Sequence, residues 1–422
     1  MYNNKQVTIV GAGLAGLCSA YFLINKGYRV SIIEQQKSVA LGASYANGGL
    51  LTPSMPEPWN APGIFSQLLK YLGKNDAPML LKPRYLHQYI SWGVRFLSNS
   101  NLSQYKFATL HNMKLAMFSL AKLAKISEQL EGTFEYKLNG TIKVFRSTQA
   151  LEQTLKRTRF LSDNGLAHEA LTTPQLIELE PALEDAQSQL CGGIYYPQDA
   201  TGNARQFCHA LARYITLNGG EFHFNSDVHR LKVHGGKIYG VVTNNQEFDC
   251  QSLIITAGAW STELLSSLGI NIPVKPVKGY SLSVPAKQSK YMPQHAILDD
   301  EMHAAITPLG KQIRLAGTAE FSGWNAKIDP SRIENLWHFF QSLMPNLYAN
   351  SNRHESESWC GFRPMSADGL PFIGGTHVKG LYVNTGHGPL GWTQAAGSAF
   401  ILSQQITGGV AGIDASPYQL RN

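Results

Sequence analysis

Cysteine is scarce in this sequence, and its placement argues against two kinds of scaffold. The chain has five cysteines among 422 residues, an odd number at wide spacings: Cys18, Cys191, Cys208, Cys250 and Cys360. They form no C-x-x-C pair, and no histidine stands at ligand spacing from them. A disulfide framework and a metal site are therefore not expected, and a reducing compartment fits best.

The signatures of several enzyme classes are also missing. The sequence has no H-E-x-x-H, no P-loop Gly-Lys-Ser/Thr and no serine nucleophile elbow, so metalloprotease, NTPase and hydrolase functions have no support. Its 39 glycines and 20 prolines follow no repeat period, which excludes collagen-like, solenoid and low-complexity architectures. With 43% hydrophobic and 15% charged residues, the chain can build a large core in two or three domains.

Long apolar runs are missing too, apart from one near the N-terminus. Residues 7–24 carry no charge and follow Lys5, so the segment could be a signal peptide or a membrane span. The glycines at set positions inside it, and the second apolar run that follows over residues 28–33, argue against both interpretations. No later segment reaches about 18 uncharged apolar residues, so we expect a soluble or peripheral protein.

That N-terminal segment has the pattern of a dinucleotide site. A β-branched strand (7–10) leads into Gly-Ala-Gly-Leu-Ala-Gly (11–16), a helical run (17–25) capped by Gly27, and a second strand (28–33) that ends at Glu34. Gly11 allows the tight turn, Gly13 lets backbone N–H groups approach a pyrophosphate, and Gly16 lets helix and strand pack closely. Glu34 can accept both ribose hydroxyls of an adenosine and repels a 2′-phosphate.

The middle of the chain continues this α/β pattern. We predict a helix over 203–218, a strand over 221–224 and hairpins that turn at 235–236 and 244–245. A buried strand over 253–256 then runs into the small-residue turn 257–261. A cofactor can pass close to the backbone at such a turn, although an ordinary strand-to-helix turn has the same appearance.

The C-terminal segment favours a flavin over a nicotinamide. A strand over 381–384 leads into the glycine-rich turn 385–392 and a helix over 393–406, which is a second helix N-terminus aimed at an electron-rich group. A nicotinamide enzyme needs one such site. A flavin enzyme needs one for the pyrophosphate and one for the N1/C2=O edge, which becomes negative on reduction. His387 in this turn either packs beside Trp392 or contacts substrate or flavin.

These motifs resemble the FAD-dependent D-amino-acid oxidase superfamily, and within it the bacterial D-amino-acid dehydrogenase small subunits. The resemblance runs over almost the whole chain. It is carried by the blocks at 11–16 with Glu34, 43–49, 57–63, 279–282, 361–365, 368–371 and 385–393.

The resemblance implies an α/β (α+β overall) protein with two interleaved domains. A Rossmann-like FAD-binding domain takes residues 1–55, 195–265 and 355–422. The substrate domain takes 56–194 and 266–354 and is built on a mixed β-sheet. The implied cofactor-binding residues are Gly11, Ala12, Gly13, Leu14, Ala15, Gly16, Glu34, Gln35, Ser44, Asn47, Gly48, Val228, Ala257, Gly258, Gly386, Gly388, Leu390, Gly391, Trp392 and Thr393.

The resemblance also implies a substrate site. Arg363 stands where the family places the arginine that pairs with the substrate carboxylate, and a guanidinium suits that role because it binds a carboxylate bidentately. A structural arginine in an interdomain ion pair is the alternative. Ala304 and Ala305 offer no substrate hydroxyl, which leaves Tyr280 and Tyr45 as candidates. Cys360 is out of register with the cysteine that some relatives bond to flavin, so FAD is expected to be non-covalent.

The implied activity is oxidation of a D-amino acid to a 2-oxo acid and ammonia, by hydride transfer from the substrate Cα to flavin N5. Electrons would pass to a membrane quinone. A sister flavoenzyme that oxidises glycine, sarcosine or a D-imino acid such as a D-hydroxyproline, as a subunit of a heteromer, is one alternative. An FAD-stabilised interaction module without enzyme activity is another.

Charge is unevenly distributed along the chain. The net charge is +7, from 36 basic and 29 acidic residues, and the stretch 62–125 alone carries nine basic residues against Asp76, a balance of +8. It is also rich in apolar and aromatic residues at helical spacing, such as Ile64, Phe65, Leu68 and Leu69. We therefore expect a peripheral protein that lies on the anionic inner face of the cytoplasmic membrane and binds no nucleic acid. A solvated helical pair of the substrate domain is the alternative.

Overall fold

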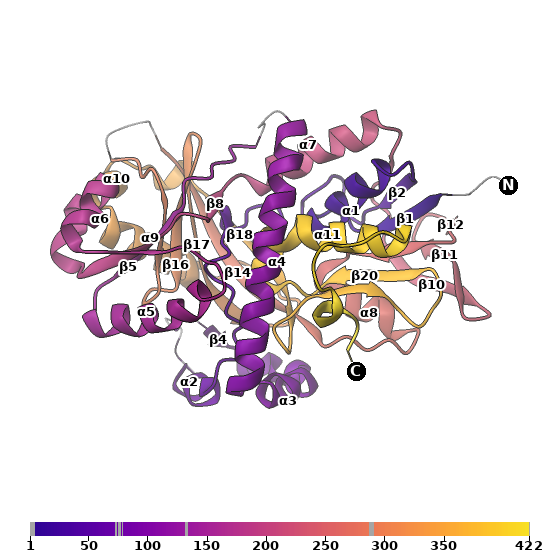
Figure 1. Cartoon of the computed structure of the whole chain (residues 1–422), viewed down its shortest axis with the longest axis horizontal. Coiled ribbons are helices and arrows are strands. Elements are labelled where there is room, and N and C mark those ends of the chain that lie inside the picture. The colour runs from indigo at the N-terminus through magenta and orange to yellow at the C-terminus, as the bar shows by residue number, and fades with distance from the viewer. Residues whose placement is uncertain are drawn as a thin grey trace.

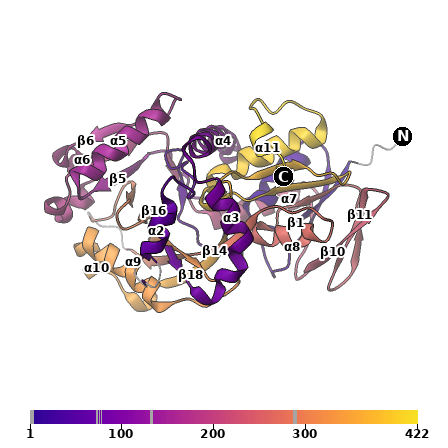
Figure 2. The same cartoon turned by 90° about the horizontal axis from the view of Figure 1, so that it is seen from below.

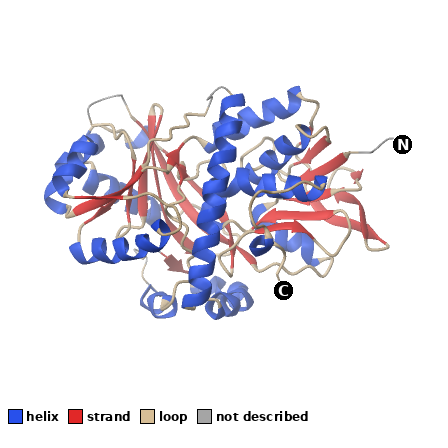
Figure 3. Ribbon diagram, viewed as in Figure 1, coloured by secondary structure: helices blue, strands red, loops and turns tan. Residues whose placement is uncertain are grey.

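Two large β-sheets organise the molecule. The computed structural model describes residues 5–71, 74, 77, 79–130, 134–286 and 291–421, so Asp76 of the basic stretch lies outside the described residues. In Figures 1 and 3 the smaller sheet lies towards the N-terminus and the larger sheet at the opposite end, with helices packed on both. The mixed α/β architecture predicted from the sequence is confirmed.

The six-stranded sheet gathers segments from the whole length of the chain. Its neighbouring strands are parallel except for the antiparallel pair at one edge. In spatial order the strands are β19 (Phe372–Gly375), β20 (Leu381–Thr385), β13 (Leu253–Ile255), β1 (Gln6–Val10), β2 (Arg29–Ile33) and β9 (Glu221–His223). The two predicted glycine-rich loops follow β1 and β20. They therefore leave the same sheet, separated only by β13.

The first βαβ unit folds as its sequence predicts, with one shift of boundary. Helix α1 (Leu14–Ile24) begins at Leu14 instead of Leu17, because Gly13 is already its extended N-cap residue. The helix packs tightly on the strand: a β-carbon at Gly16 would overlap the carbonyl oxygen of Gly11. Gly27 has a φ of +76°, a left-handed conformation that glycine adopts without strain.

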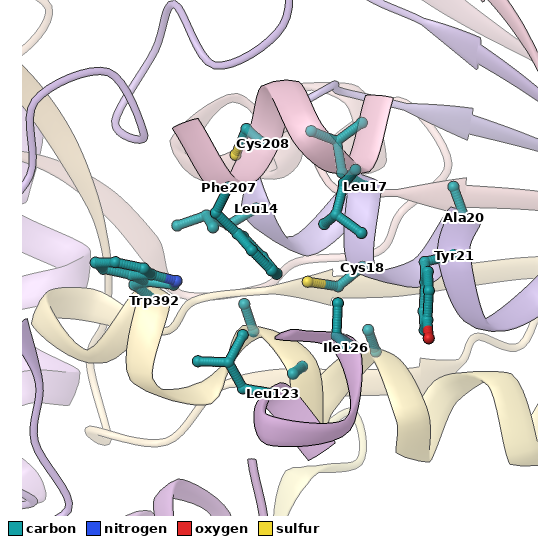
Figure 4. Packing of buried hydrophobic residues seen from close by; sticks show 14 of the residues in the cluster. Leu14, Leu17, Cys18, Ala20, Tyr21, Leu123, Ile126, Phe207, Cys208 and Trp392 are labelled. Atoms are coloured by element: carbon teal, nitrogen blue, oxygen red, sulfur yellow. The ribbon is translucent and has the colours of Figure 1, made fainter. Parts of the chain in front are cut away.

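A shared hydrophobic core joins four helices to the six-stranded sheet (Figure 4). The helices are α1, α4 (Leu102–Gln129), α7 (Ala204–Leu217) and α11 (Gly391–Thr407). Leu17, Phe207 and Ile126 are fully buried in this core, and burying one such side chain contributes about 1.5–3 kcal/mol. Helices α4 and α11 pack closely, since a β-carbon at Gly397 would lie 2.8 Å from the Ser119 side chain. The two glycine-rich loops therefore start from elements that share one packed core.

The nine-stranded sheet is mixed, as expected. In spatial order it contains β18 (Glu357–Ser366), β14 (Val274–Pro285), β17 (Gln312–Phe321), β16 (Ala304–Leu309), β15 (Ala296–Asp299), β5 (Thr141–Phe145), β7 (Gly192–Tyr196) and β6 (Glu169–Leu171), and β4 (Met79–Leu81) pairs with β17. Its outer face packs on α9 (Pro330–Leu343). Strand β18 lies in this sheet although it falls within the predicted FAD segment 355–422. The division into two domains stays a prediction.

The remaining elements connect or flank the two large sheets. They are α2 (Ile64–Tyr71), α3 (Ile90–Ser98), α5 (Thr148–Ser162), α6 (Thr173–Leu179), α8 (Ser261–Ser266), α10 (Pro345–Ala349), the β-ribbon β10–β11–β12 (Val228–His234, Lys237–Thr243, Glu247–Asp249), the short pair β3 and β8 (Leu50–Leu51, Ala200–Thr201), and six 3₁₀ turns (Pro83–Tyr89, Pro181–Gln189, Gly258–Trp260, Arg353–Glu355, Gly388–Leu390, Ser416–Tyr418). Figure 2 shows α2 and α3 together on one side of the molecule. Within the described residues, every helix is too short or too polar to cross a membrane.

Candidate functional site

A cavity of about 1250 Å³ runs between the two sheets. Its lining includes the ends of β1, β2 and β13, the loop 40–48, the turn 384–392, and one face of β14, β16, β17 and β18. Most ligand pockets have a volume of 300–1,000 Å³. This cavity is large enough for a dinucleotide and a small substrate together.

The loop that follows β1 lines one part of this cavity and offers backbone N–H groups to a ligand. Gly11 has a φ of +106°, and a β-carbon there would lie 2.7 Å from the carbonyl oxygen of Thr256, so glycine is required for both conformation and space. Ser44 accepts a hydrogen bond from the Leu14 N–H at 3.2 Å, which ties the loop 40–48 to the start of α1. The helix N-terminus and its amides face the cavity, where they favour an anionic group.

Glu34 lies beside this loop. One carboxylate oxygen accepts from the Ala12 N–H at 2.7 Å and the other from the Gln36 N–H at 2.9 Å. Burial raises the pKa of Glu34, and these backbone hydrogen bonds lower it. The oriented carboxylate faces the cavity with lone pairs to spare for hydroxyl donors.

The C-terminal loop carries polar atoms that have no protein partner. Both side-chain polar atoms of Asn384, Nε2 of His387 and Nε1 of Trp392 are buried without a hydrogen bond among the described residues, and all three residues line the cavity. Unpaired buried polar groups cost free energy, so such a group of them indicates that a ligand completes their bonding. Burial lowers the pKa of His387 to about 4, which leaves the imidazole neutral at pH 7.

Arg363 faces the cavity from β18. A β-carbon at Gly279 of the neighbouring strand β14 would overlap its guanidinium, and Nη1 donates to the Thr318 carbonyl oxygen at 3.0 Å. No carboxylate lies within 4.0 Å of it among the described residues, so the interdomain ion pair considered above is not formed. Burial alone lowers its pKa to about 10, so it remains charged at pH 7. A cation held in this way is suited to an anionic ligand.

The two tyrosine candidates direct their hydroxyl groups elsewhere. Tyr280 borders the cavity, but its hydroxyl donates to Glu320, which also pairs with Lys278 at 3.0 Å. Tyr45 donates to Glu357 at 2.8 Å and stacks on Trp359. Cys360 also borders the cavity, and its thiol donates to the Ala326 carbonyl oxygen at 3.3 Å.

Most of the predicted cofactor residues meet in this cavity. Four do not line it: Ala12, Gly16, Gly386 and Thr393. Ala12 and Gly16 support residues that do line the cavity. The Ala12 N–H donates to Glu34, and Gly16 packs closely on Gly11. Gly386 turns the loop with a φ of +83°, and Thr393 accepts from the Thr52 N–H at 3.1 Å. The cofactor-binding roles of the whole set stay predictions.

Several residues that line the cavity were not predicted as site residues from the sequence. Asn384 ends a buried strand just before the glycine-rich turn, which is a position that could have been noticed. Gly279 belongs to the block 279–282 that carries the resemblance, but nothing local in the sequence points to its contact with Arg363, and Thr318 has no local signal. Glu57, Lys143 and Asp300 form a charged group at one end of the cavity. A lysine inside the apolar strand Thr-Ile-Lys-Val-Phe was the available signal for Lys143.

The fold and the site together define a dinucleotide-dependent oxidoreductase whose cavity is bordered by two helix N-termini. Comparison with known proteins gives the family: residues 6–405 match the family model described as FAD dependent oxidoreductase. The chain belongs to this family, and its cofactor is FAD.

Named relatives agree with this. The chain is 36% identical to a D-amino acid dehydrogenase of Rhizobium rhizogenes (strain K84 / ATCC BAA-868), over 97% of either chain. It is 34% identical to that of Vibrio vulnificus (strain YJ016), over 96% of either chain. Among solved structures, glycine oxidase from Geobacillus kaustophilus aligns with a TM-score of 0.78 at 21% identity, over 99% of this chain and 98% of that one. At this identity the match shows the fold alone.

The residues present fit FAD. The α1 N-terminus suits a pyrophosphate and Glu34 a ribose that carries both hydroxyls, while the unpaired polar atoms of Asn384, His387 and Trp392 offer partners to the polar edges of a flavin. The two loops leave one sheet, as a single extended cofactor requires.

Proposed function

We propose that this chain oxidises D-amino acids to 2-oxo acids and ammonia. The observation that carries the proposal is the cavity-facing guanidinium of Arg363, which has no acidic partner among the described residues. A buried cation is stable when an anion completes it, and the α-carboxylate of an amino acid is such an anion. The curated relatives at 34–36% identity are named D-amino acid dehydrogenases, which favours this substrate over the glycine, sarcosine and D-imino acid alternatives.

The chain's own residues would bind and orient the substrate. Arg363 would hold the carboxylate and, with the Gly279 surface beneath it, fix the position of Cα in the cavity. Ala305 and Ala316 lie on neighbouring strands of the same sheet face and leave room above it for the amino acid. Bound FAD supplies the two-electron acceptor for the hydride that leaves Cα, and water then hydrolyses the imino acid.

Product analysis tests this activity. Purified holoprotein is supplied with D-alanine and a soluble redox dye, and dye reduction, pyruvate and ammonia are measured together. The proposal predicts the three in equal amounts and none with L-alanine. Dye reduction by L-alanine alone, or by sarcosine alone, would contradict it.

We further propose that the protein works on an anionic membrane surface, at the inner face of the cytoplasmic membrane, and passes electrons to a quinone. Support comes from one side of the molecule, where α2 and α3 lie together (Figure 2). Phe65 and Leu69 of α2 are 57% and 58% exposed, and Ile90 and Val94 of α3 are 66% and 65% exposed. Such exposed patches mark protein or membrane contacts.

Basic side chains surround this patch, although fewer than the sequence predicted. Lys70, Arg84 and Arg95 are exposed around it. Lys82 is not free, because its ammonium pairs with Asp329 at 2.9 Å. Lys122 lies over the Phe400 ring of α11 and belongs to another face. The patch therefore combines apolar anchors with exposed basic side chains, as an interfacial surface does. A heteromeric partner seated on the same patch is the alternative occupant.

A further inference from the structure

The cavity has a second charged end, formed by Glu57, Lys143 and Asp300 together with Arg157 of α5. Lys143 projects from the middle of β5, and its ammonium pairs with Asp300 at 3.2 Å. Arg157 approaches the other oxygen of Asp300 at 3.9 Å. Lys143 is only 7% exposed, so an interior charge lies where the sheet is otherwise lined by Leu298, Ala305 and Ala316.

Within this group, Glu57 is the uncommitted member. Asp300 already attracts both cations, whereas the Glu57 carboxylate has no ion pair within 4.0 Å among the described residues and accepts a hydrogen bond from its own backbone N–H. Burial raises the pKa of Glu57, and Lys143 is the largest influence that lowers it. Glu57 is thus close enough to Lys143 to interact electrostatically but too far for direct contact. Both residues line the cavity, so a polar group of a ligand can approach them there.

The backbone links this group to the carboxylate site. The Thr318 carbonyl oxygen accepts from Arg363 at 3.0 Å, and the Thr318 N–H donates to the His303 carbonyl oxygen at 3.4 Å. His303 and Asp300 belong to the turn that joins β15 to β16. These strands lie one and two places from β17, so the turn is roughly 5–10 Å to the side of Thr318. An amino-acid side chain of a few bonds can span that distance.

On the basis of the proposed function, we infer that Glu57 and Lys143 recognise the end of the substrate side chain and select D-amino acids that end in a carboxamide. An amide donates through its NH₂ group and accepts through its oxygen, so it can satisfy Glu57 and Lys143 together. A cationic side chain meets repulsion from Lys143 and Arg157, and an anionic one meets repulsion from Glu57 and Asp300. An apolar side chain displaces water from Glu57 and Lys143 and offers no hydrogen bond in its place.

The first measurement compares matched substrates of the holoprotein. kcat/KM is determined with a soluble dye for D-glutamine, D-norleucine, D-glutamate and D-lysine, with D-alanine as a reference that has no distal group. We expect D-glutamine to exceed D-norleucine by about 10–100-fold, less than for a fully buried polar site because Asp300 and Arg157 are partly exposed. Equal values for these two, or a preference for D-lysine or D-glutamate over D-glutamine, would overturn the inference.

The second measurement assigns the preference to residues. Glu57→Gln keeps the shape and removes the charge. It should lower the D-glutamine to D-norleucine ratio about tenfold and raise D-glutamate relative to D-glutamine. Lys143→Met should lower the same ratio. Lys156→Met, on the exposed face of α5, is the matched control and should leave the ratio unchanged.

The outcomes separate this inference from the proposed function. FAD content and thermal midpoint are recorded for every variant, so that a folding defect is recognised, and Glu57→Gln tests the idea even if Lys143→Met does not fold. Oxidation of D-alanine without any amide preference would overturn the side-chain site and leave the proposed function intact. Failure of every D-amino acid to reduce the flavin would contradict the proposed function itself.

Discussion

The guanidinium of Arg363 lies directly over the backbone of Gly279, on the neighbouring strand of the large sheet. Even an alanine β-carbon there would overlap the guanidinium, so a larger residue would have to displace the Arg363 side chain. The guanidinium therefore packs against the backbone of Gly279, and no carboxylate of the described residues neutralises its charge. The proposed site for the substrate carboxylate therefore depends on the missing side chain of Gly279 as well as on the charge of Arg363.

Replacing Arg363 should impair substrate binding and spare the cofactor. Arg363→Lys should raise KM strongly, because the bidentate geometry is lost. Arg363→Ala should lower kcat/KM by a factor that corresponds to a loss of about 2–5 kcal/mol in transition-state stabilisation. Steady-state kinetics with D-alanine measure both. Gly279→Ala offers an independent route, since it should displace the guanidinium and also raise KM. FAD absorbance should stay at the wild-type level in all three variants, and near-wild-type kinetics would remove Arg363 from this role.

Glu34 should control cofactor affinity. Glu34→Ala removes the proposed acceptor for the ribose hydroxyls and the hydrogen bond from the Ala12 N–H, so FAD should bind more weakly. Since FAD binds only the folded state, the thermal midpoint of the holoprotein should fall towards that of the apoprotein. Melting curves with and without added FAD measure this effect. If added FAD raises the thermal midpoint of Glu34→Ala as much as that of the wild type, Glu34 does not hold the cofactor.

His387 should make the protein less stable in mild acid. Its folded-state pKa is about 4, below the ordinary value of 6.5, because burial disfavours the charged form. As the pH falls through 6.5 the unfolded chain takes up a proton that the folded chain refuses, so stability present above pH 6.5 is lost towards pH 4. The expected loss between pH 7 and pH 5 is about 2 kcal/mol.

The matched variant isolates this contribution. Urea unfolding of wild type and His387→Gln at both pH values gives two differences in the free energy of unfolding, and other titrating groups contribute equally to each. The wild-type difference should be larger by the amount due to His387. Identical differences would show that His387 is protonated in the folded protein.

The patch on α2 and α3 should bind anionic vesicles. We predict that the protein sediments with vesicles containing anionic lipid at low salt and is released at high salt. Reversing Lys70, Arg84 and Arg95 to Glu should weaken binding by at least about 3 kcal/mol, at about 1 kcal/mol for each cation removed. Reversing Lys37, Lys237 and Lys311, which are exposed elsewhere, changes the net charge equally and should have little effect. Equal loss in both triple variants would mean that net charge, not this patch, governs the association.

Local signals explain what could be predicted from the sequence. The loop after β1 depends on residues close together in the chain, so its glycines and Glu34 were found from spacing alone. The same holds for α7, whose predicted start at Asn203 is its N-cap, with a side chain that accepts from the Gln206 N–H at 3.2 Å. Strand β4 was not predicted: residues 79–81 read as part of a helical stretch, and they form a strand because they pair with residues 319–321.

Convergence of distant segments explains what could not be predicted. Glu57, Lys143 and Asp300 come from a loop, a strand and a turn, and only the strand order β17–β16–β15–β5 brings them to one end of the cavity. The pairing of Lys82 with Asp329 is equally remote in sequence, and it removes one cation from the predicted basic surface. No periodicity or composition reports such contacts.

Anaerobic reduction of the bound FAD tests the central claim most directly. The holoprotein is mixed with D-alanine, L-alanine, glycine, sarcosine or D-proline in the absence of oxygen, and the flavin absorbance is followed. The account predicts complete bleaching by D-alanine, none by L-alanine, and a large loss of the D-alanine rate in Arg363→Ala. Bleaching by glycine or sarcosine but not by D-alanine, or no bleaching by any amine, would contradict it.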